Sequence, residues 1–513
     1  MDRQRSAGAV GLALIAALAA CSSSSAPQGL GARRAAGAAR DLVGTSDGAW
    51  LAYLDGCVEA RAQSLPTGTA NCDLRVVPAA GGDATVVARA VTTLPGAVAV
   101  SPVGAELAVL AAYDYASASG TLVRWRAGAG VGELASGVTF HGYGPDGGLG
   151  YIAGGELFLG APGANPTAIS GVTGAASFEL APPEGTIGAL VRRRATAGGE
   201  LLAIGRAKDG PRPAPVLVSS PVGDYAFGRA IYAFTRLGRD GAELQIASAR
   251  SSSARPEPIA RTVRAFAFEP AGDAIAFLAD AAPGKLGNLR VRAGGRELAL
   301  GNEVGEFRWA TRAPRLGWIE DYHVHSGALG VGGLDLPRRT LGKNVSDLEL
   351  SADGKYVAFL QHTTRGGYSV DLLLAALDAP PDTAPRRVTQ GSYGFAFSPD
   401  GRWLYYRDAC TRNGEGCDLE RVPAASPDAK PEKLAEGMKS FEFDPRDPGR
   451  LLVSWKRLDR DALDIAVWDG GKLVTVDTYV LPGSARFLGG PPRRVAYVVT
   501  QEKRAGVYVA DVP

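Results

Sequence analysis

The sequence predicts an all-β fold made of repeated four-stranded units, and three observations support this prediction. A polar turn followed at once by a short alternating apolar strand recurs along the chain, most clearly at Ser398–Asp408. Glycine and proline are abundant, at 68 and 33 of 513 residues. No long stretch after residue 42 shows helical periodicity. A repeat that extends along most of a chain indicates the overall architecture without reference to any single residue.

The repeat runs from about residue 42 to the C-terminus. Its clearest copies begin at Ser46, Glu269, Ser351 and Ser398. Weaker copies begin near Ser101, Gly144, Pro182, Gly228, Pro314, Asp444 and Pro491. About eleven units therefore follow one another at the ~40–50 residue spacing that is typical of propeller blades.

Each unit contains four predicted strands. An Asp-Gly pair or its equivalent forms the opening turn, because the Asp side chain bonds its own backbone and the glycine accepts positive φ. In the unit that opens at Ser398, the residues before the turn (Gly394–Phe397) form one strand, and further strands follow the hairpin at Asp418–Pro423 and Glu432–Leu434. A four-stranded unit cannot bury both of its faces alone, so the units are expected to stack radially as a β-propeller.

The length of the chain favours two consecutive propellers. The part after the N-terminal segment, about 470 residues, exceeds the ~250–300 residues at which single cores stop growing, and eleven blades exceed the usual 4–8 of one ring. We expect an N-terminal propeller at 42–265 and a C-terminal propeller at 266–513, with a boundary near the linker-like Arg250–Pro258 stretch. The alternatives are one large propeller and a simple loop at Arg250–Pro258.

The repeated turn and strand resemble the WD40-like "PD40" repeat of TolB-like β-propellers. Ser398–Gly401 match its Ser-Pro-Asp-Gly turn fully, and Ser351–Gly354 match with Ala352 in place of proline. The units near Gly154, Pro182 and Pro314 depart from the pattern, and the N-terminal α/β domain of TolB itself is not found. The resemblance implies a propeller of the bacterial envelope that makes protein–protein contacts.

The N-terminus predicts export and lipid anchoring. Arg3 and Arg5 precede an apolar run, Ala7–Ala20, that is too short to span a bilayer. The segment ends in Leu18–Cys21, which resembles the lipobox of bacterial lipoproteins, whose cysteine is lipidated and becomes the new N-terminus. We therefore expect a signal peptide at 1–20 and a lipidated Cys21 with a flexible tether at 21–41. The alternative is an ordinary secretory signal that contains a cysteine.

The residues after Cys21 predict where the anchored protein resides. A serine-rich tether, Ser22–Ser25, follows directly and continues through Ala26–Arg40. Acyl chains anchor stably once two or more are present. Ser22, in place of an aspartate, is similar to the family pattern for outer-membrane delivery. The expected location is the bacterial cell envelope at the outer membrane, on its periplasmic side or on the cell surface.

The four remaining cysteines fall into two close pairs, Cys57 with Cys72 and Cys410 with Cys417. Each pair follows the first strand after a turn and precedes the next strand, so both pairs are expected to close a hairpin loop as a disulfide. Loops of this size would contribute roughly 2.5–3 kcal/mol each. The competing interpretation is a four-cysteine zinc site, but neither spacing matches C-x2-C.

Motifs for catalysis, metal or nucleotide binding are weak, so no catalytic residue, metal site or cofactor is predicted. His323 and His325 lie at strand spacing but lack a third ligand. Gly44–Gly48 fits G-x-S-x-G without the helix that a nucleophile elbow needs. Gly128–Gly132 is followed by no helix, which indicates a hairpin turn. The acids of Asp459–Asp464 do not fit an EF-hand and indicate a charged loop.

Charge argues against nucleic acid as a partner. The formal net charge is +2, and basic clusters such as Arg192–Arg194, Arg338–Arg339 and Arg493–Arg494 are too scattered to form a phosphate-binding stripe.

Two functions follow from these observations. The first is a membrane-anchored envelope lipoprotein that binds or scaffolds envelope proteins through the loops of its propeller and is not an enzyme. The alternative is a propeller enzyme that acts on a glycan or peptide at the central channel, which clustered acids or histidines there would favour.

Overall fold

The computed structural model describes residues 32–512 apart from 38, 61–64, 185, 195–198, 207–213, 252–253, 271, 282–284, 324, 364–369, 393, 412–415 and 458–460. In this part of the chain the regular secondary structure is β-strand, and every strand pair is antiparallel. No helix among these residues is long and apolar enough to cross a membrane. The all-β prediction is confirmed.

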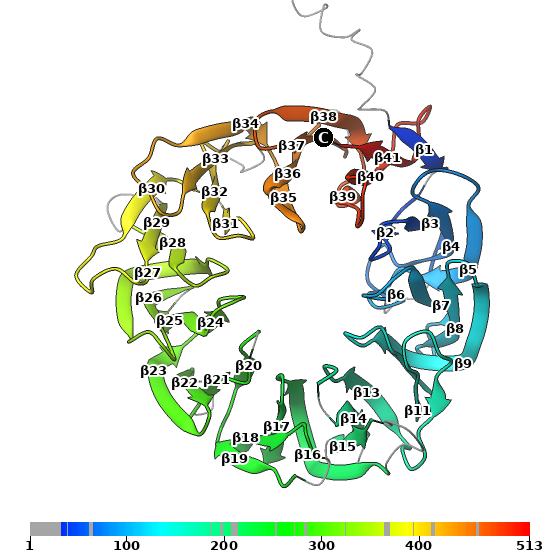
Figure 1. The fold of residues 1–513 in the computed structure, drawn as a ribbon, viewed down its shortest axis with the longest axis horizontal. Coiled ribbons are helices and arrows are strands. Elements are labelled where there is room, and N and C mark those ends of the chain that lie inside the picture. Colours follow the sequence, from blue (N-terminus) through cyan, green and yellow to red (C-terminus); the bar gives the residue numbers. More distant parts are fainter. Residues whose placement is uncertain are drawn as a thin grey trace, which may run out of the picture.

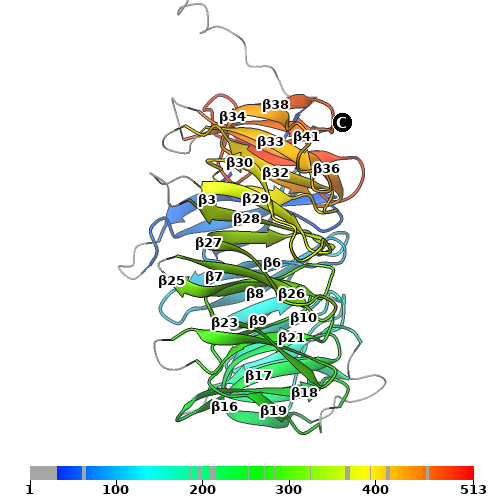
Figure 2. The same ribbon diagram turned by 90° about the vertical axis from the view of Figure 1, so that its left-hand side faces the viewer.

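The strands form eleven four-stranded blades within the described residues. Three sheets are single blades of four strands. The other four sheets hold seven or eight strands, because each joins two neighbouring blades. In Figure 1 the blades follow one another around one ring, and Figure 2 shows the ring edge-on with the strands crossing its thickness.

The first five blades hold strands β2 to β19. Blade 1 consists of β2 (Leu42–Gly44), β3 (Trp50–Glu59), β4 (Ala70–Pro78) and β5 (Thr85–Thr92). Blades 2 and 3 consist of β6 (Val98–Val100), β7 (Glu106–Asp114), β8 (Ser119–Arg126), the shared β9 (Gly130–Tyr143), β10 (Leu149–Ala153), β11 (Glu156–Leu159) and β12 (Thr167–Ala168). Blades 4 and 5 consist of β13 (Ala175–Leu180), β14 (Ile187–Arg193), β15 (Gly199–Gly205), the shared β16 (Val216–Phe227), β17 (Ile231–Gly238), β18 (Gly241–Ser248) and β19 (Glu257–Ala260).

The next four blades hold strands β20 to β34. Blade 6 consists of β20 (Ala265–Phe268), β21 (Ile275–Ala279), β22 (Gly287–Ala293) and β23 (Arg296–Val304). Blades 7 and 8 consist of β24 (Glu306–Trp309), β25 (Arg315–His323), β26 (Ser326–Gly333), the shared β27 (Arg339–Leu350), β28 (Tyr356–His362), β29 (Val370–Ala376) and β30 (Arg386–Gln390). Blade 9 consists of β31 (Phe395–Phe397), β32 (Trp403–Asp408), β33 (Cys417–Pro423) and β34 (Glu432–Met438).

The last two blades bring the two ends of the chain together. Blade 10 consists of β35 (Ser440–Asp444), β36 (Asp447–Lys456), β37 (Leu463–Trp468) and β38 (Leu473–Val480). Blade 11 consists of β39 (Arg486–Phe487), β40 (Arg494–Val499) and β41 (Gly506–Asp511), with β1 (Arg33–Ala36) as its outermost strand.

The N-terminal strand β1 therefore closes the ring. Arg33 lies opposite Val509 of β41 in the strand register, and Figure 1 shows the two strands side by side. Leu51 and Tyr53 of blade 1 share a buried cluster with Ala496 and Val498 of blade 11. The first and last blades thus pack as neighbours.

The structure has one ring, so the predicted division into propellers at 42–265 and 266–513 is corrected. Ala233 and Leu244 before the expected boundary share a buried cluster with Ile275 and Phe277 after it. The Arg250–Pro258 stretch leads from β18 into β19 of one blade, which is the loop alternative. The size limit of a single core does not apply, because each blade buries its faces only against its two neighbours.

The opening turns of blades 8 and 9 share one hydrogen-bonded design. At Ser398 the hydroxyl donates to Asp400 Oδ1 over 2.6 Å and accepts from the Trp403 N–H over 3.0 Å. Gly401 adopts φ 72° and donates its N–H to the Ser398 carbonyl. The Ser351 turn makes the same bonds, with 2.8 Å from its hydroxyl to Asp353. The repeated sequence phrase is therefore a repeated turn that directs the chain into the second strand.

Candidate functional site

The ring presents two different faces. Because neighbouring strands of a blade are antiparallel, the turns that join first to second and third to fourth strands lie on one face, which we call the turn face. The links from second to third strands, and from each blade to the next, lie on the opposite face, which we call the loop face. Ser398–Gly401 belongs to the turn face, and the link between β3 and β4 belongs to the loop face.

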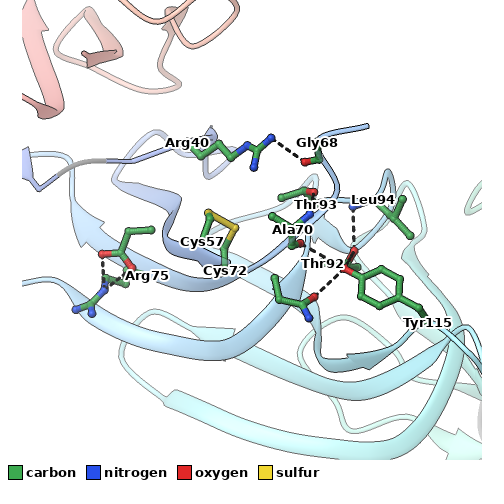
Figure 3. The surroundings of a disulfide bond; sticks show 12 residues. Arg40, Cys57, Gly68, Ala70, Cys72, Arg75, Thr92, Thr93, Leu94 and Tyr115 are labelled. Carbon is green, nitrogen blue, oxygen red and sulfur yellow. Dashed lines mark hydrogen bonds and ion pairs between the residues drawn. A yellow bond between two sulfur atoms is a disulfide. The ribbon is translucent and has the colours of Figure 1, made fainter. Parts of the chain in front are cut away.

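Both predicted disulfides form, and both lie on the loop face. Cys57 of β3 is bonded to Cys72 of β4, and Cys410, which follows β32, is bonded to Cys417 of β33. Each bond therefore closes the link between the second and third strands of its blade, as the sequence predicts. Figure 3 shows the first of these bonds near Tyr115 of the following blade.

The loop closed by Cys57–Cys72 is fastened to blade 2. The Tyr115 hydroxyl, which comes from the loop after β7, lies 2.8 Å from Asn71 Oδ1 and 3.1 Å from Thr92 Oγ1 (Figure 3). Arg40 donates to the Gly68 carbonyl over 2.8 Å. These contacts join the described end of the loop to neighbouring segments of the ring, Tyr115 of blade 2 among them.

The first strand of each blade lies on the inner side of the ring (Figure 1), where three glutamates occupy equivalent positions. Glu179 accepts the N–H of Phe227 over 3.5 Å, and Glu349 accepts the N–H of Phe397 over 3.1 Å. In both cases the donor belongs to the next blade, so each carboxylate links two blades. Glu442 holds the same position in β35.

Burial changes the acidity of these glutamates. Burial raises the pKa of Glu349 to about 7, while the Phe397 N–H and nearby Arg308 partly oppose this rise. Burial also raises the pKa of Glu179 and of Glu442. The three glutamates belong to blades 4, 8 and 10, so they are spread around the ring. Sequence analysis did not single them out, although each lies between two apolar residues just before an opening turn.

The weaker motifs lie in turns and loops. Ser46, the serine of Gly44–Gly48, donates its hydroxyl to the Gly104 carbonyl of blade 2 over 2.7 Å. Gly128–Gly132 forms the hairpin between β8 and β9, as predicted, with Arg126 opposite Gly130. The glycines adopt positive φ at Gly128 and Gly130.

The two histidines and the described part of the acidic loop form no recognisable ion site. His323 and His325 are exposed at the end of the β25–β26 hairpin. Asp464 pairs with Arg457 over 3.1 Å, whereas Asp459 lies outside the described residues. No group of three or more His, Cys, Asp or Glu side chains that could hold a metal occurs in the part of the chain that the structure describes.

The predicted signal peptide at 1–20 and the lipidation site Cys21 also lie outside the described residues, which begin at Ala32. The structure therefore leaves both as predictions.

Comparisons with known proteins found only distant likenesses to solved structures. No protein-family model and no curated protein sequence matches the chain. Among solved structures, a eukaryotic initiation factor is 13% identical, with a TM-score of 0.42, over 74% of this chain and 96% of its own. The tricorn protease is 13% identical, with a TM-score of 0.31, over 91% of this chain and 51% of its own. A chain of the nidogen/laminin complex is 10% identical, with a TM-score of 0.24, over 55% of this chain and 97% of its own. Likenesses this low carry no argument about function.

Proposed function

We propose that this protein is a membrane-anchored lipoprotein of the bacterial envelope whose TolB-like propeller binds or scaffolds other envelope proteins. Its anchor would be the lipidated Cys21, and the outer membrane is the proposed location because Ser22 follows the cysteine. The proposal includes no catalytic residue, cofactor or nucleic acid. The ring would act by binding a partner protein.

The observation that carries this proposal is where the chain enters the ring. β1 is the fourth strand of blade 11 and runs antiparallel to β41. Arg33, at the start of β1, pairs with Asp511, near the end of the chain, over 3.5 Å. A fourth strand begins on the turn face, so a tether that precedes residue 33 would join the ring there. The turn face would then lie toward the membrane and the loop face away from it.

The loop face is suited to a protein partner for two reasons. Its links vary in length and sequence between blades, while three of the opening turns on the opposite face, at Thr45, Ser351 and Ser398, repeat one design. Two of the links are closed by disulfides, which are typical of oxidising compartments outside the cytoplasm. Connecting loops on a rigid scaffold commonly carry binding function.

The anchor is tested by labelling cells with a radioactive fatty acid and separating their membranes. The proposal predicts label on the wild-type chain, loss of label in a Cys21→Ser variant, and release of that variant from the outer-membrane fraction. Equal labelling of both chains, or none of either, would contradict lipidation at Cys21.

The binding face is tested by attaching a photoactivatable cross-linker at one site on each face of blade 2. Ser117→Cys places it on the loop face, and Val103→Cys places it in an exposed position on the turn face. We expect one specific envelope protein to be captured from Ser117, with much less from Val103. Capture from Val103 alone would show that the turn face is the binding face.

A further inference from the structure

A cavity of about 390 Å³ opens on the loop face where blade 5 meets blade 6. Residues of the β17–β18 hairpin and of the link that follows β19 line it, among them Arg236, Leu237, Arg239, Asp240, Glu243 and Arg261. Its volume lies in the ~300–1,000 Å³ range of small-ligand sites.

Backbone hydrogen bonds fix both walls of this cavity. The hairpin is tight, because Gly238 and Gly241 are paired and only Arg239 and Asp240 lie between them. The Val263 N–H donates to the Ala242 carbonyl over 2.8 Å and joins the link to the hairpin. The Asp280 N–H of blade 6 donates to the Arg261 carbonyl over 3.3 Å. The cavity is therefore a feature of the ordered ring.

Three exposed arginines line the cavity, and their side chains have no partner among the described residues. Among the described residues, the side chains of Arg236, Arg239 and Arg261 make no hydrogen bond or ion pair. Neighbouring arginines differ, since Arg290 pairs with Glu297 over 2.9 Å and Arg292 pairs with Glu257 over 2.5 Å.

The acidic residues of the cavity cancel this charge only in part. Glu243 lies opposite Arg236 in the strand register, but it accepts a hydrogen bond from the Gln245 amide over 2.6 Å. Asp240 lies at the tip of the hairpin. Three cationic groups thus face two carboxylates, and a formal charge of +1 remains, because the neutral Gln245 amide leaves the charge of Glu243 unchanged.

We propose that this cavity binds a small anionic group, a carboxylate or a phosphate, on a ligand with a short apolar portion. The planar guanidinium presents paired donors that match both anions. The apolar portion would lie on Leu237, which is 40% exposed beside the arginines. The site does not depend on the anchor, and the anion would come either from a free small molecule or from an acidic side chain of a protein partner.

Titration calorimetry at low salt tests the site with three probes: inorganic phosphate, succinate, and the blocked peptide acetyl-Asp-Leu-Glu-amide. We compare the folded wild-type ring with the double variant Arg239→Gln/Arg261→Gln. The control is Arg89→Gln/Arg296→Gln, which removes the same charge at exposed arginines outside the cavity.

We expect saturable binding of at least one probe to the wild type and the control, and about tenfold or greater weakening in the Arg239/Arg261 variant. Binding of phosphate or succinate would indicate a free anion, and binding of the peptide alone would indicate an acidic protein segment. The proposal is overturned if no probe binds saturably up to about 10 mM, or if the control weakens binding as much as the cavity variant.

Discussion

We predict that Glu349 makes the stability of the ring depend on pH. Its carboxyl is partly buried between blades 8 and 9, where it accepts the Phe397 N–H and lies near Arg308 and Asp347. Burial raises its pKa from 4.5 to about 7. The folded protein therefore holds a proton between these pH values that the unfolded chain has released.

The sign follows from proton linkage. A group whose pKa is raised on folding contributes stability that is complete below about pH 4.5 and is lost as the pH rises through about 7. This increase in the pKa of Glu349 corresponds to a contribution of about 3 kcal/mol to the free energy of unfolding. Replacing Glu349 by glutamine keeps an acceptor for the Phe397 N–H and removes the ionisation.

The assay is urea unfolding of the wild type and Glu349→Gln at several values between about pH 4.5 and pH 8. We expect the wild type to lose stability over this range relative to the variant, so that the variant is the more stable protein above pH 7. Glu502→Gln, at an exposed position in blade 11, is the control and should follow the wild type. Parallel pH profiles for Glu349→Gln and the wild type would refute the reasoning.

Two further predictions concern the two disulfides and the packing of the core. Replacing both cysteines of Cys57–Cys72 by alanine should lower the free energy of unfolding by roughly 3 kcal/mol, because that loop spans 15 residues. The same change at Cys410–Cys417 should lower it by roughly 2.4 kcal/mol, because that loop spans 7 residues. Equal unfolding midpoints for both variants and the wild type would contradict this prediction. Gly330→Ala should destabilise the ring by about 1–3 kcal/mol or more, because its Cβ would overlap the buried Trp318 ring. Gly132→Ala, whose Cβ meets nothing within 4 Å, should leave the thermal midpoint unchanged, and equal midpoints for the two alanine variants would count against the core packing.

The sequence predicts the repeating unit well because the unit depends on local chemistry. The Ser398 turn is closed by its own side chains and by the positive φ of Gly401, so the residues that specify it are adjacent. The same holds for Cys410 and Cys417, which bracket one loop. In the first blade, Thr45 holds the place that Ser398 has in blade 9, and its hydroxyl donates to Asp47.

Features that depend on distant parts of the chain were not predictable in this way. The single ring requires Arg33 to lie beside Val509, a pairing that no repeat pattern encodes. The pKa of Glu349 depends on how closely blade 9 covers it, and the cavity needs Arg261 to lie beside the hairpin that holds Arg239. These arrangements come from the packing of whole blades.

The most direct test of the ring is a cross-link across its closure. In a Cys21→Ser background, Arg33→Cys with Asp511→Cys places two exposed thiols on paired strands, and a short bismaleimide should join them within one chain, as mass spectrometry of the linked peptides would show. Arg33→Cys with Glu257→Cys, on the outer strand of blade 5, should not be joined. One closed eleven-bladed ring predicts the first link, whereas recovery of the second link alone would show that the N-terminal half closes on itself and would contradict the single ring.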